Sequence, residues 1–194
     1  MVRKGGTRMA LGGAGEGGNG RRLLILGVVA GVFLTLVAVL ASAFVVEATS
    51  TDRFCTQCHV MIPFKQAWED SVHGGNNPQG FKAQCTDCHL PHTNLVEYLM
   101  VKTQTGIHDV VANMTIDPLT HDWMGNAEKN RTNFTFESAC MACHQDLTPP
   151  GQKPGARKAH RAYLLGETEK GCVDCHPHVG HKDMGDRVAR WFKG

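Results

Sequence analysis

The longest apolar stretch of the chain runs from Leu23 to Val46 and contains no charged residue. As a helix, these 24 residues would measure about 36 Å, enough to cross a bilayer with some tilt. Residues 41–43, Ala-Ser-Ala, resemble a signal-peptidase site, but the apolar core of a signal peptide spans only about 7–15 residues. The pattern therefore predicts a retained transmembrane anchor over residues 23–46.

The segment before this stretch, residues 1–22, is rich in glycine and cannot bury a core, so we expect it to be disordered. Its charges are one acid, Glu16, and five bases: Arg3, Lys4, Arg8, Arg21 and Arg22. A basic flank stays in the cytoplasm during insertion. The N-terminus is thus predicted to be cytoplasmic, and residues 47–194 periplasmic, in a single-pass protein of the bacterial inner membrane.

Beyond the anchor, the apolar pattern is weaker and contains few strand signals. Apolar positions at helical spacing predict a helix over Asn94–Met114, although Gly106 and several threonines weaken the pattern. A second helix is predicted over 156–165, after a loop over 148–155. The last nine residues, 186–194, fit either an amphipathic surface helix, with its Trp–Phe pair on a membrane or partner, or a solvated tail.

Cysteine usage changes the picture, because all eight cysteines fall into four copies of C-x-x-C-H. The copies are Cys55–Cys58–His59, Cys85–Cys88–His89, Cys140–Cys143–His144 and Cys172–Cys175–His176. This motif attaches haem c through two thioethers, and its histidine supplies the proximal nitrogen to iron. Zinc sites and disulfide frameworks do not need a histidine after every second cysteine. The sequence therefore predicts a cytochrome with four covalently bound haems c.

Length and charge bound the architecture. The net charge of +2 gives no reason to expect a nucleic-acid partner. Residues 47–194 are few for four haems, so the porphyrins themselves should form most of the core. The predicted fold is mainly α: one N-terminal transmembrane helix and a small, loop-rich multihaem domain.

The first haem should lie close to the membrane. Only eight residues separate Val46 from Cys55, and even fully extended they reach no further than about 26–29 Å. A redox centre held there is suited to exchange electrons with a lipid-soluble quinol or quinone, and the later haems would carry charge outwards.

Seven further histidines are candidates for the sixth iron ligand. They are His73, His92, His108, His121, His160, His178 and His181. Two imidazoles on one iron make an electron carrier rather than a catalytic site, so several of the seven should be ligands. Spacing alone does not say which.

Three motifs together resemble the NapC/NirT family of membrane-anchored tetrahaem quinol dehydrogenases, over residues 21 to about 182. The first motif reads CxxCHxM, the second CxDCHxPH, and the last is followed by histidines in CVDCHPHVGH. The resemblance implies electron transfer from the membrane quinone pool to a periplasmic oxidoreductase, for nitrite, nitrate or related respiration. The sequence leaves open whether the chain forms a homo-oligomer or a complex with that reductase.

The resemblance also suggests iron ligands. In NrfH-like members the methionine of the first motif, here Met61, takes the place of the adjacent histidine, here His59. A thioether ligand raises the potential relative to a second imidazole. The alternative is that His59 binds normally and Met61 only packs on the porphyrin. For the other haems the implied pairs are His89 with His181, His176 with His73, and His144 with His160 (a NapC-like feature), with His92 as the main competitor.

Quinol oxidation releases two protons, so a base is needed near the first haem. Lys102 and Asp109 lie seven residues apart, on one face of the predicted helix. The family pattern has a lysine and an aspartate at this spacing, both implicated at the quinol site. His108 stands where NrfH-like sequences have arginine and is a second proton acceptor. The plain alternative is a solvated pair on an exposed helix.

Two other functions fit parts of the sequence. The same module could run backwards and reduce quinone with electrons from a periplasmic oxidation, such as that of hydroxylamine. A catalytic multihaem enzyme for nitrite or hydroxylamine is of another class, and it would be signalled by a CxxCK motif, which is not present.

Overall fold

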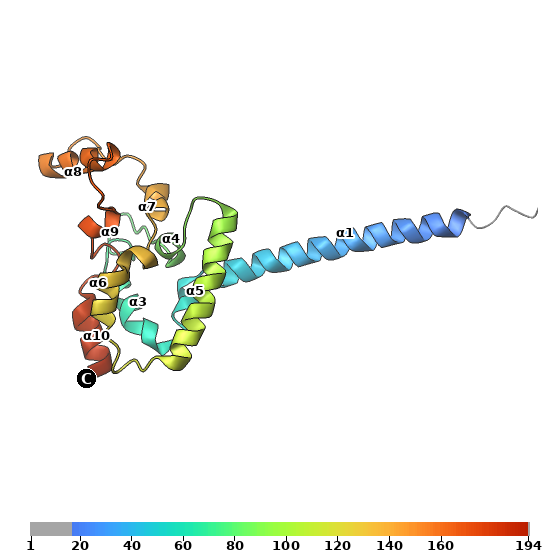
Figure 1. Cartoon of the computed structure of the whole chain (residues 1–194), viewed down its shortest axis with the longest axis horizontal. Helices are drawn as coiled ribbons and strands as arrows, with labels where there is room; N and C mark the ends of the chain where they lie inside the picture. Colours follow the sequence, from blue (N-terminus) through green and yellow to red (C-terminus); the bar gives the residue numbers. More distant parts are fainter. Residues whose placement is uncertain (1–16, 194) are drawn as a thin grey trace, which may run out of the picture. The chain divides into compact units, whose positions relative to one another are not determined.

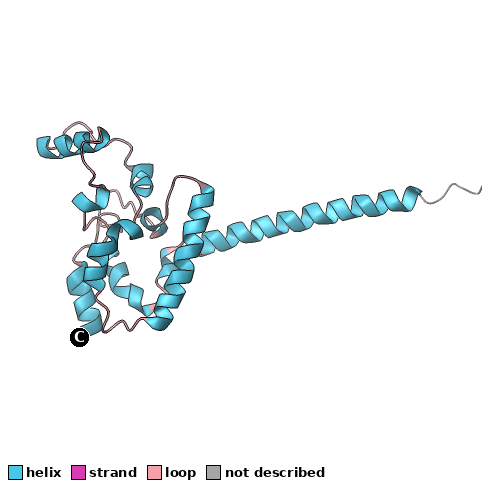
Figure 2. Ribbon diagram, in the orientation of Figure 1, coloured by secondary structure: helices cyan, strands magenta, loops and turns pink. Residues whose placement is uncertain are grey.

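The computed structural model describes residues 17–193, and every regular element in that range is a helix (Figures 1 and 2). The elements are α1 (Gly17–Ala48), α2 (Asp52–Cys55), the 3-10 helix η1 (His59–Met61), α3 (Ile62–Glu69), α4 (Thr86–His89), α5 (Leu95–Thr115), α6 (Trp123–Phe134), α7 (Glu137–Cys143), α8 (Pro154–Leu164), α9 (Cys172–Cys175) and α10 (Met184–Lys193). Pairing of β type is limited, in the described range, to one isolated bridge between Gly74 and Lys82. The prediction of a mainly α fold is confirmed.

The chain divides after Glu47 into two compact units. The first contains α1, and residues 19–48 of it are long and apolar enough to cross a membrane, alone among the helices described. The helix begins at Gly17, before the predicted anchor, so the prediction of disorder is wrong for residues 17–22. The extension has a simple physical reason, since a helix once nucleated extends at little cost. Residues 1–16, also predicted to be disordered, lie outside the described range.

The second unit contains the predicted central helix, α5, within one residue of its expected bounds. Asn94 caps its N-terminus, since the Asn94 side chain accepts a hydrogen bond from the backbone N–H of Glu97 at 2.9 Å. Two of the threonines that weakened the prediction, Thr103 and Thr105, turn their hydroxyls back onto carbonyls four residues earlier. They are therefore satisfied within the helix.

Helix α8 begins at Pro154, two residues before its predicted start, because proline at the first helical position loses no hydrogen bond. The C-terminal residues form α10, which packs on α3 and buries Val188. The ring of Phe192 stacks on Trp123, with centroids 5.5 Å apart. The expectation of a solvated tail is therefore wrong, and Phe192 packs inside the second unit.

Few protein side chains are fully packed in this second unit. The buried side chains are those of Pro63, Ala67, Trp68, Ser71, Ala83, Leu90, Pro91, Ala139 and Val188. A unit of about 150 residues ordinarily buries far more apolar surface than this. The polypeptide therefore needs a further apolar component, which is what four porphyrins would provide.

Candidate functional site

Each C-x-x-C-H motif lies in or beside a short helix. Helix α2 ends at Cys55, α4 ends at His89, α7 ends at Cys143, and α9 begins at Cys172 and ends at Cys175. Three residues make nearly one helical turn, so where the motif is helical both thiols lie on the same side. All eight cysteines are free thiols in the described chain, as thioether attachment requires.

Three of the four motif histidines face a second histidine ring. The ring pairs are His89 with His181 at 6.0 Å between centroids, His144 with His73 at 6.0 Å, and His176 with His160 at 6.1 Å. A ligating imidazole nitrogen lies about 2 Å from its metal ion, so two rings on opposite sides of one iron have centroids about 6 Å apart. The three pairs fit bis-histidine haem ligation.

Backbone carbonyls orient four of these imidazoles through Nδ1. His89 Nδ1 donates to the carbonyl of Phe134 at 2.5 Å, and His181 Nδ1 donates to that of Phe64 at 3.0 Å. His73 Nδ1 donates to the carbonyl of Val179 at 3.2 Å, and His160 Nδ1 donates to that of Leu147 at 2.6 Å. A carbonyl only accepts, so Nδ1 must carry the proton. Nε2 is then left with its lone pair, the form that binds a metal.

Burial favours the same neutral form at the second motif. Desolvation lowers the pKa of His89. Burial and the neighbouring charge of His89 lower the pKa of His181 to about 4. Both rings are thus uncharged at neutral pH, as ligation by nitrogen requires.

The geometry corrects the pairing implied by the family resemblance. His73 lies beside His144 rather than His176, and His160 lies beside His176 rather than His144. The same three distal histidines are brought to motif histidines, but two of them are exchanged. His92 instead stacks edge-on with Tyr98, at 6.4 Å.

The first motif differs from the other three. Within the described residues, the His59 ring has no histidine ring facing it. Met61 lies at the other end of the same 3-10 turn. The asymmetry that CxxCHxM suggested is therefore present in the arrangement of the histidines.

Consecutive motifs lie next to each other. The neighbouring Cys85 thiol lowers the pKa of Cys55 to about 7, which places the first two motifs in contact. The charge of Cys143 acts on Cys88, and Cys140 and Cys172 interact through their thiols. The four attachment sites therefore follow one another in space in their sequence order.

Three hydrogen bonds join these motifs. The backbone N–H of Asp52 donates to Gln84 Oε1 at 3.1 Å, and that of Phe136 donates to the carbonyl of Cys88 at 3.3 Å. The N–H of Cys172 donates to Glu137 Oε1 at 3.1 Å. Glu137 also accepts a hydrogen bond from the Tyr163 hydroxyl at 2.8 Å, which raises the pKa of Tyr163 to about 12. Sequence reasoning missed Glu137, because nothing in its local pattern marks it.

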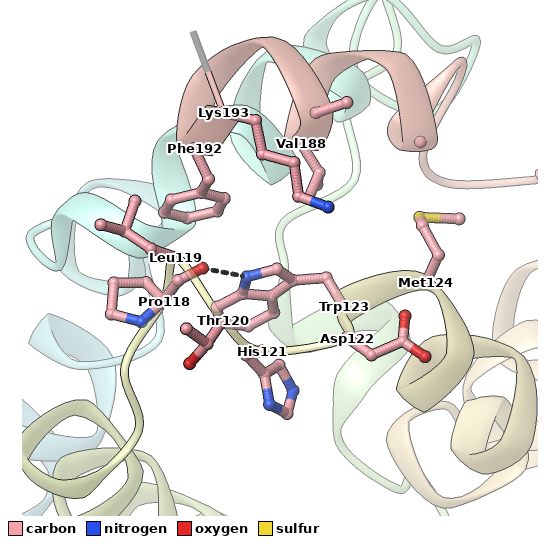
Figure 3. A pocket seen from close by; sticks show the side chains of 12 residues that line it. Pro118, Leu119, Thr120, His121, Asp122, Trp123, Met124, Val188, Phe192 and Lys193 are labelled. Carbon is pink, nitrogen blue, oxygen red and sulfur yellow. Dashed lines mark hydrogen bonds between the residues drawn. The ribbon is translucent and has the colours of Figure 1, made fainter.

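Two cavities accompany the helices. One, of about 300 Å³, lies between the third and fourth motifs and is lined by Cys140, Cys172 and Phe136. Its lining is mixed, because Glu137, Glu169 and Asp174 face it together with the two attachment cysteines. The other, of about 240 Å³, lies beside α10 around Trp123, whose Nε1 donates to the carbonyl of Pro118 at 2.9 Å (Figure 3). Of the seven candidate histidines it contains His121, whose ring packs edge-on against Trp123 with centroids 4.6 Å apart.

The predicted quinol-site residues lie on α5, close to the first motif. The charges of Lys102 and Asp109 both act on the Cys55 thiol. Lys102 Nζ donates to the carbonyl of Thr49 at 3.0 Å and to Ser50 Oγ at 2.9 Å, so it is held in place rather than solvated. This clamp on the residues that follow α1 was not foreseen from the sequence.

The acidic end of the pair is more open. His108 Nδ1 lies 3.4 Å from Asp109 Oδ1, and the two side chains are 71% and 80% exposed. Both groups are therefore accessible to a substrate arriving from outside the polypeptide.

Comparison with known proteins decides the family. The model of the NapC/NirT cytochrome c family, N-terminal region, matches residues 19–185. The chain belongs to the NapC/NirT family.

Relatives in this family include the tetraheme c-type cytochrome CymA of Shewanella oneidensis, 36% identical over 82% of this chain and 88% of CymA. The cytochrome c-type protein NapC of Escherichia coli is 32% identical over 70% of each chain. NrfH of Wolinella succinogenes is 28% identical over 82% of this chain and 83% of NrfH.

A solved structure shares the fold. It is a chain of the cytochrome c nitrite reductase NrfHA complex bound to the inhibitor HQNO, with a TM-score of 0.51 and 30% identity over 81% of this chain and 91% of that one. Membership of the NapC/NirT family implies covalent haem c, and the four motifs and three imidazole pairs fit that cofactor.

Proposed function

We propose that this NapC/NirT protein oxidises a membrane quinol beside its first haem and passes the electrons along the row of motifs to a periplasmic reductase. The observation that carries the proposal is the position of Lys102 and Asp109. They come from one helix, α5, and Lys102 is hydrogen-bonded to Thr49 and Ser50, a few residues before Cys55 of the first motif. A hydrogen-bond donor and a base beside an electron acceptor are the groups that quinol oxidation needs.

The proton chemistry falls to three side chains. A quinol that becomes a quinone loses two electrons and two protons. Lys102 binds one quinol oxygen and stabilises negative charge on it, and Asp109 accepts a proton as a general base. His108, 3.4 Å from Asp109, receives protons from it and releases them to solvent.

Bound haem c supplies one-electron redox chemistry. The cysteines of the four motifs would hold the four groups. Met61, or alternatively His59, would ligate the first iron. The other three irons would be ligated by His89 with His181, His144 with His73, and His176 with His160.

Topology follows from the anchor. Arg21 and Arg22 flank the apolar part of α1 on its N-terminal side. By the positive-inside rule, the N-terminus is cytoplasmic and residues from 47 onwards are periplasmic, in the inner membrane.

The exit side is proposed to be α8, next to the fourth motif through His160. This helix carries Arg157, Lys158 and Arg161, no acid, and all three bases are exposed. None of the three forms an ion pair with a described residue. A basic surface beside the last redox centre would attract an acidic periplasmic reductase and speed its encounter.

Anaerobic stopped-flow absorbance tests the quinol reaction directly. The purified full chain in nanodiscs is mixed with a reduced menaquinol analogue, and the haem α-band is followed. Asp109→Asn should slow reduction about 10²-fold, the usual contribution of a general base. Lys102→Ala should slow it less, by about tenfold, as expected for one lost interaction with a charged group.

Ser50→Ala is the matched control, because it removes one partner of Lys102 while it keeps the amine. A slow Lys102→Ala with a normal Ser50→Ala assigns the lysine to the substrate. If quinol leaves the haems oxidised while reduced protein gives electrons to quinone, the module runs backwards. If no exchange occurs in either direction, the proposal fails.

A further inference from the structure

Helix α5 exposes an apolar stripe, which only Thr103 interrupts. Its members, 53% to 79% exposed, are Val96, Met100, Ile107, Val110, Val111 and Met114. At about 100° per residue, all six fall within one sector of the helix, about 100° wide. Scattered exposed apolar residues are ordinary on a soluble protein, but a stripe along a whole 21-residue helix marks an interaction surface.

The chemical site is on another side of the same helix. Lys102 lies about 130° and Asp109 about 150° around the helix from the middle of this stripe. The half-buried positions Tyr98, Val101 and Thr105 also face away from the stripe, towards the rest of the second unit. A haem attached at Cys55, beside Lys102 and Asp109, would therefore leave the stripe uncovered.

The residues that directly follow α1 are hydrogen-bonded to α5. Helix α1 ends at Ala48, and the next two residues, Thr49 and Ser50, accept hydrogen bonds from Lys102. The Tyr98 hydroxyl lies 3.2 Å from Ser50 Oγ. Two residues reach no further than about 7 Å, so the chain that follows α1 is fixed beside Tyr98 and Lys102 of α5.

We propose that α5 lies in the membrane interface, with this apolar stripe in the hydrocarbon boundary and with lipid as its occupant. An amphipathic helix held at a bilayer buries its apolar face about 5–10 Å into the headgroup and acyl boundary. The connector argues for lipid over a second copy of the chain, because it keeps the helix at the bilayer.

The membrane position of α5 would explain how quinol reaches the proposed oxidation site. Only this functional role, and not the position itself, depends on the proposed function. A quinol dissolved in the hydrocarbon reaches Lys102 and Asp109 by moving around α5, and it need not cross the aqueous headgroup layer. Protons accepted by Asp109 and His108 leave on the aqueous side of the helix.

Lipid-borne photolabelling tests the inference. Full-chain, haem-loaded protein is placed in phosphatidylcholine–phosphatidylglycerol nanodiscs that carry a lipid with a diazirine in its acyl chain. After illumination, labelled peptides are mapped by mass spectrometry. The peptides with Met100, Ile107 and Met114 should be labelled at least fivefold more than the peptide with Leu164 and Leu165. Those leucines, 55% and 64% exposed at the C-terminal end of α8, are the internal control.

Labelling of α5 no higher than that of α8 would overturn the inference. So would crosslinks between the α5 helices of two chains, accompanied by loss of lipid label, since the occupant would then be a second copy. Ile107→Lys should lower the rate of reduction by lipid-dissolved menaquinol analogue about tenfold and leave dithionite reduction unchanged, whereas Leu165→Lys should change neither. An unchanged quinol rate in Ile107→Lys would count against the inference.

The two claims fail separately. A labelled α5 without quinol oxidation would reject the proposed function and keep the membrane position. Quinol oxidation with an unlabelled α5 would do the reverse.

Discussion

Helices α5 and α8 are alike in form and opposite in the surface they expose. Each is amphipathic, and each lies beside a haem-attachment motif, α5 at the first and α8 at the fourth. Figure 1 shows them at opposite sides of the second unit. Helix α5 exposes aliphatic side chains, whereas α8 exposes three bases and no acid. The difference supports the proposals that the α5 end meets lipid and that the α8 end meets a charged protein.

The candidate iron ligands also differ between the first and the fourth motif. The fourth motif offers two imidazoles, His176 and His160, whereas the first offers His59 and Met61 without a second histidine ring nearby in the described chain. Thioether ligation raises a haem potential relative to a second imidazole. A raised potential suits an acceptor of quinol electrons.

Among the variants that test the difference between the two ends, we expect the largest effect from replacement of His160, the distal histidine on α8. His160→Ala should convert the haem held by Cys172 and Cys175 from low-spin to high-spin, because one strong ligand is lost. Magnetic circular dichroism would show one high-spin haem in four. His73→Ala should do the same to the haem held by Cys140 and Cys143.

Removing the attachment cysteines identifies which haem changes. The high-spin signal of His160→Ala should vanish when Cys172 and Cys175 are also replaced. Its persistence would contradict the pairing seen in the structure. His178→Ala, at a histidine without a facing histidine ring, should leave all spin states unchanged.

The next effect concerns the charge of α8. Reversal of two exposed bases, Arg157→Glu with Arg161→Glu, should slow electron transfer to an acidic blue-copper protein about 10- to 100-fold at low salt. The same variant should speed transfer to a basic c-type cytochrome, and both effects should shrink as ionic strength rises. Lys129→Glu, at an exposed base on α6, is the matched control. Equal rates for the two acceptors would remove α8 from the exit.

The smallest effect concerns the helix cap. Asn94 caps α5, whereas Lys153 at the start of α8 gives no side-chain cap. Asn94→Ala should cost about 1 kcal/mol of local stability, a roughly fivefold rise in hydrogen exchange over the first turn of α5. Exchange in α8 should stay unchanged. If both helices or neither responded, the cap would not support α5 independently.

The sequence reached the four motifs, the anchor and the bounds of α5 because each depends on a local pattern. The set His73, His160 and His181 came from family resemblance; the implied pair of His89 with His181 agrees with the structure, whereas the partners of His73 and His160 are exchanged. Which imidazole meets which depends on how the loops between α3 and α4 and after α9 fold, and spacing carries no information about that. The hydrogen bonds of Lys102 to Thr49 and Ser50 join residues about fifty positions apart, and no local pattern in either segment indicates them.

The packing of the C-terminus was open for a similar reason. An amphipathic segment ending in Trp191 and Phe192 predicts an apolar face, but it does not predict which residues pack against that face. The structure shows that Phe192 packs on Trp123 and that α10 packs on α3, and only the tertiary fold brings these residues together.

One measurement tests the central claim that electrons enter at the first motif and leave at the fourth. Two full-chain variants are prepared in nanodiscs, Cys55→Ala/Cys58→Ala and Cys172→Ala/Cys175→Ala, each verified by mass to hold three haems. Both are mixed anaerobically with reduced menaquinol analogue in the stopped-flow instrument. The account predicts that the variant without the fourth haem is reduced at the wild-type rate, and that the variant without the first is reduced at least 100-fold more slowly. Wild-type reduction of the variant without the first haem would contradict it.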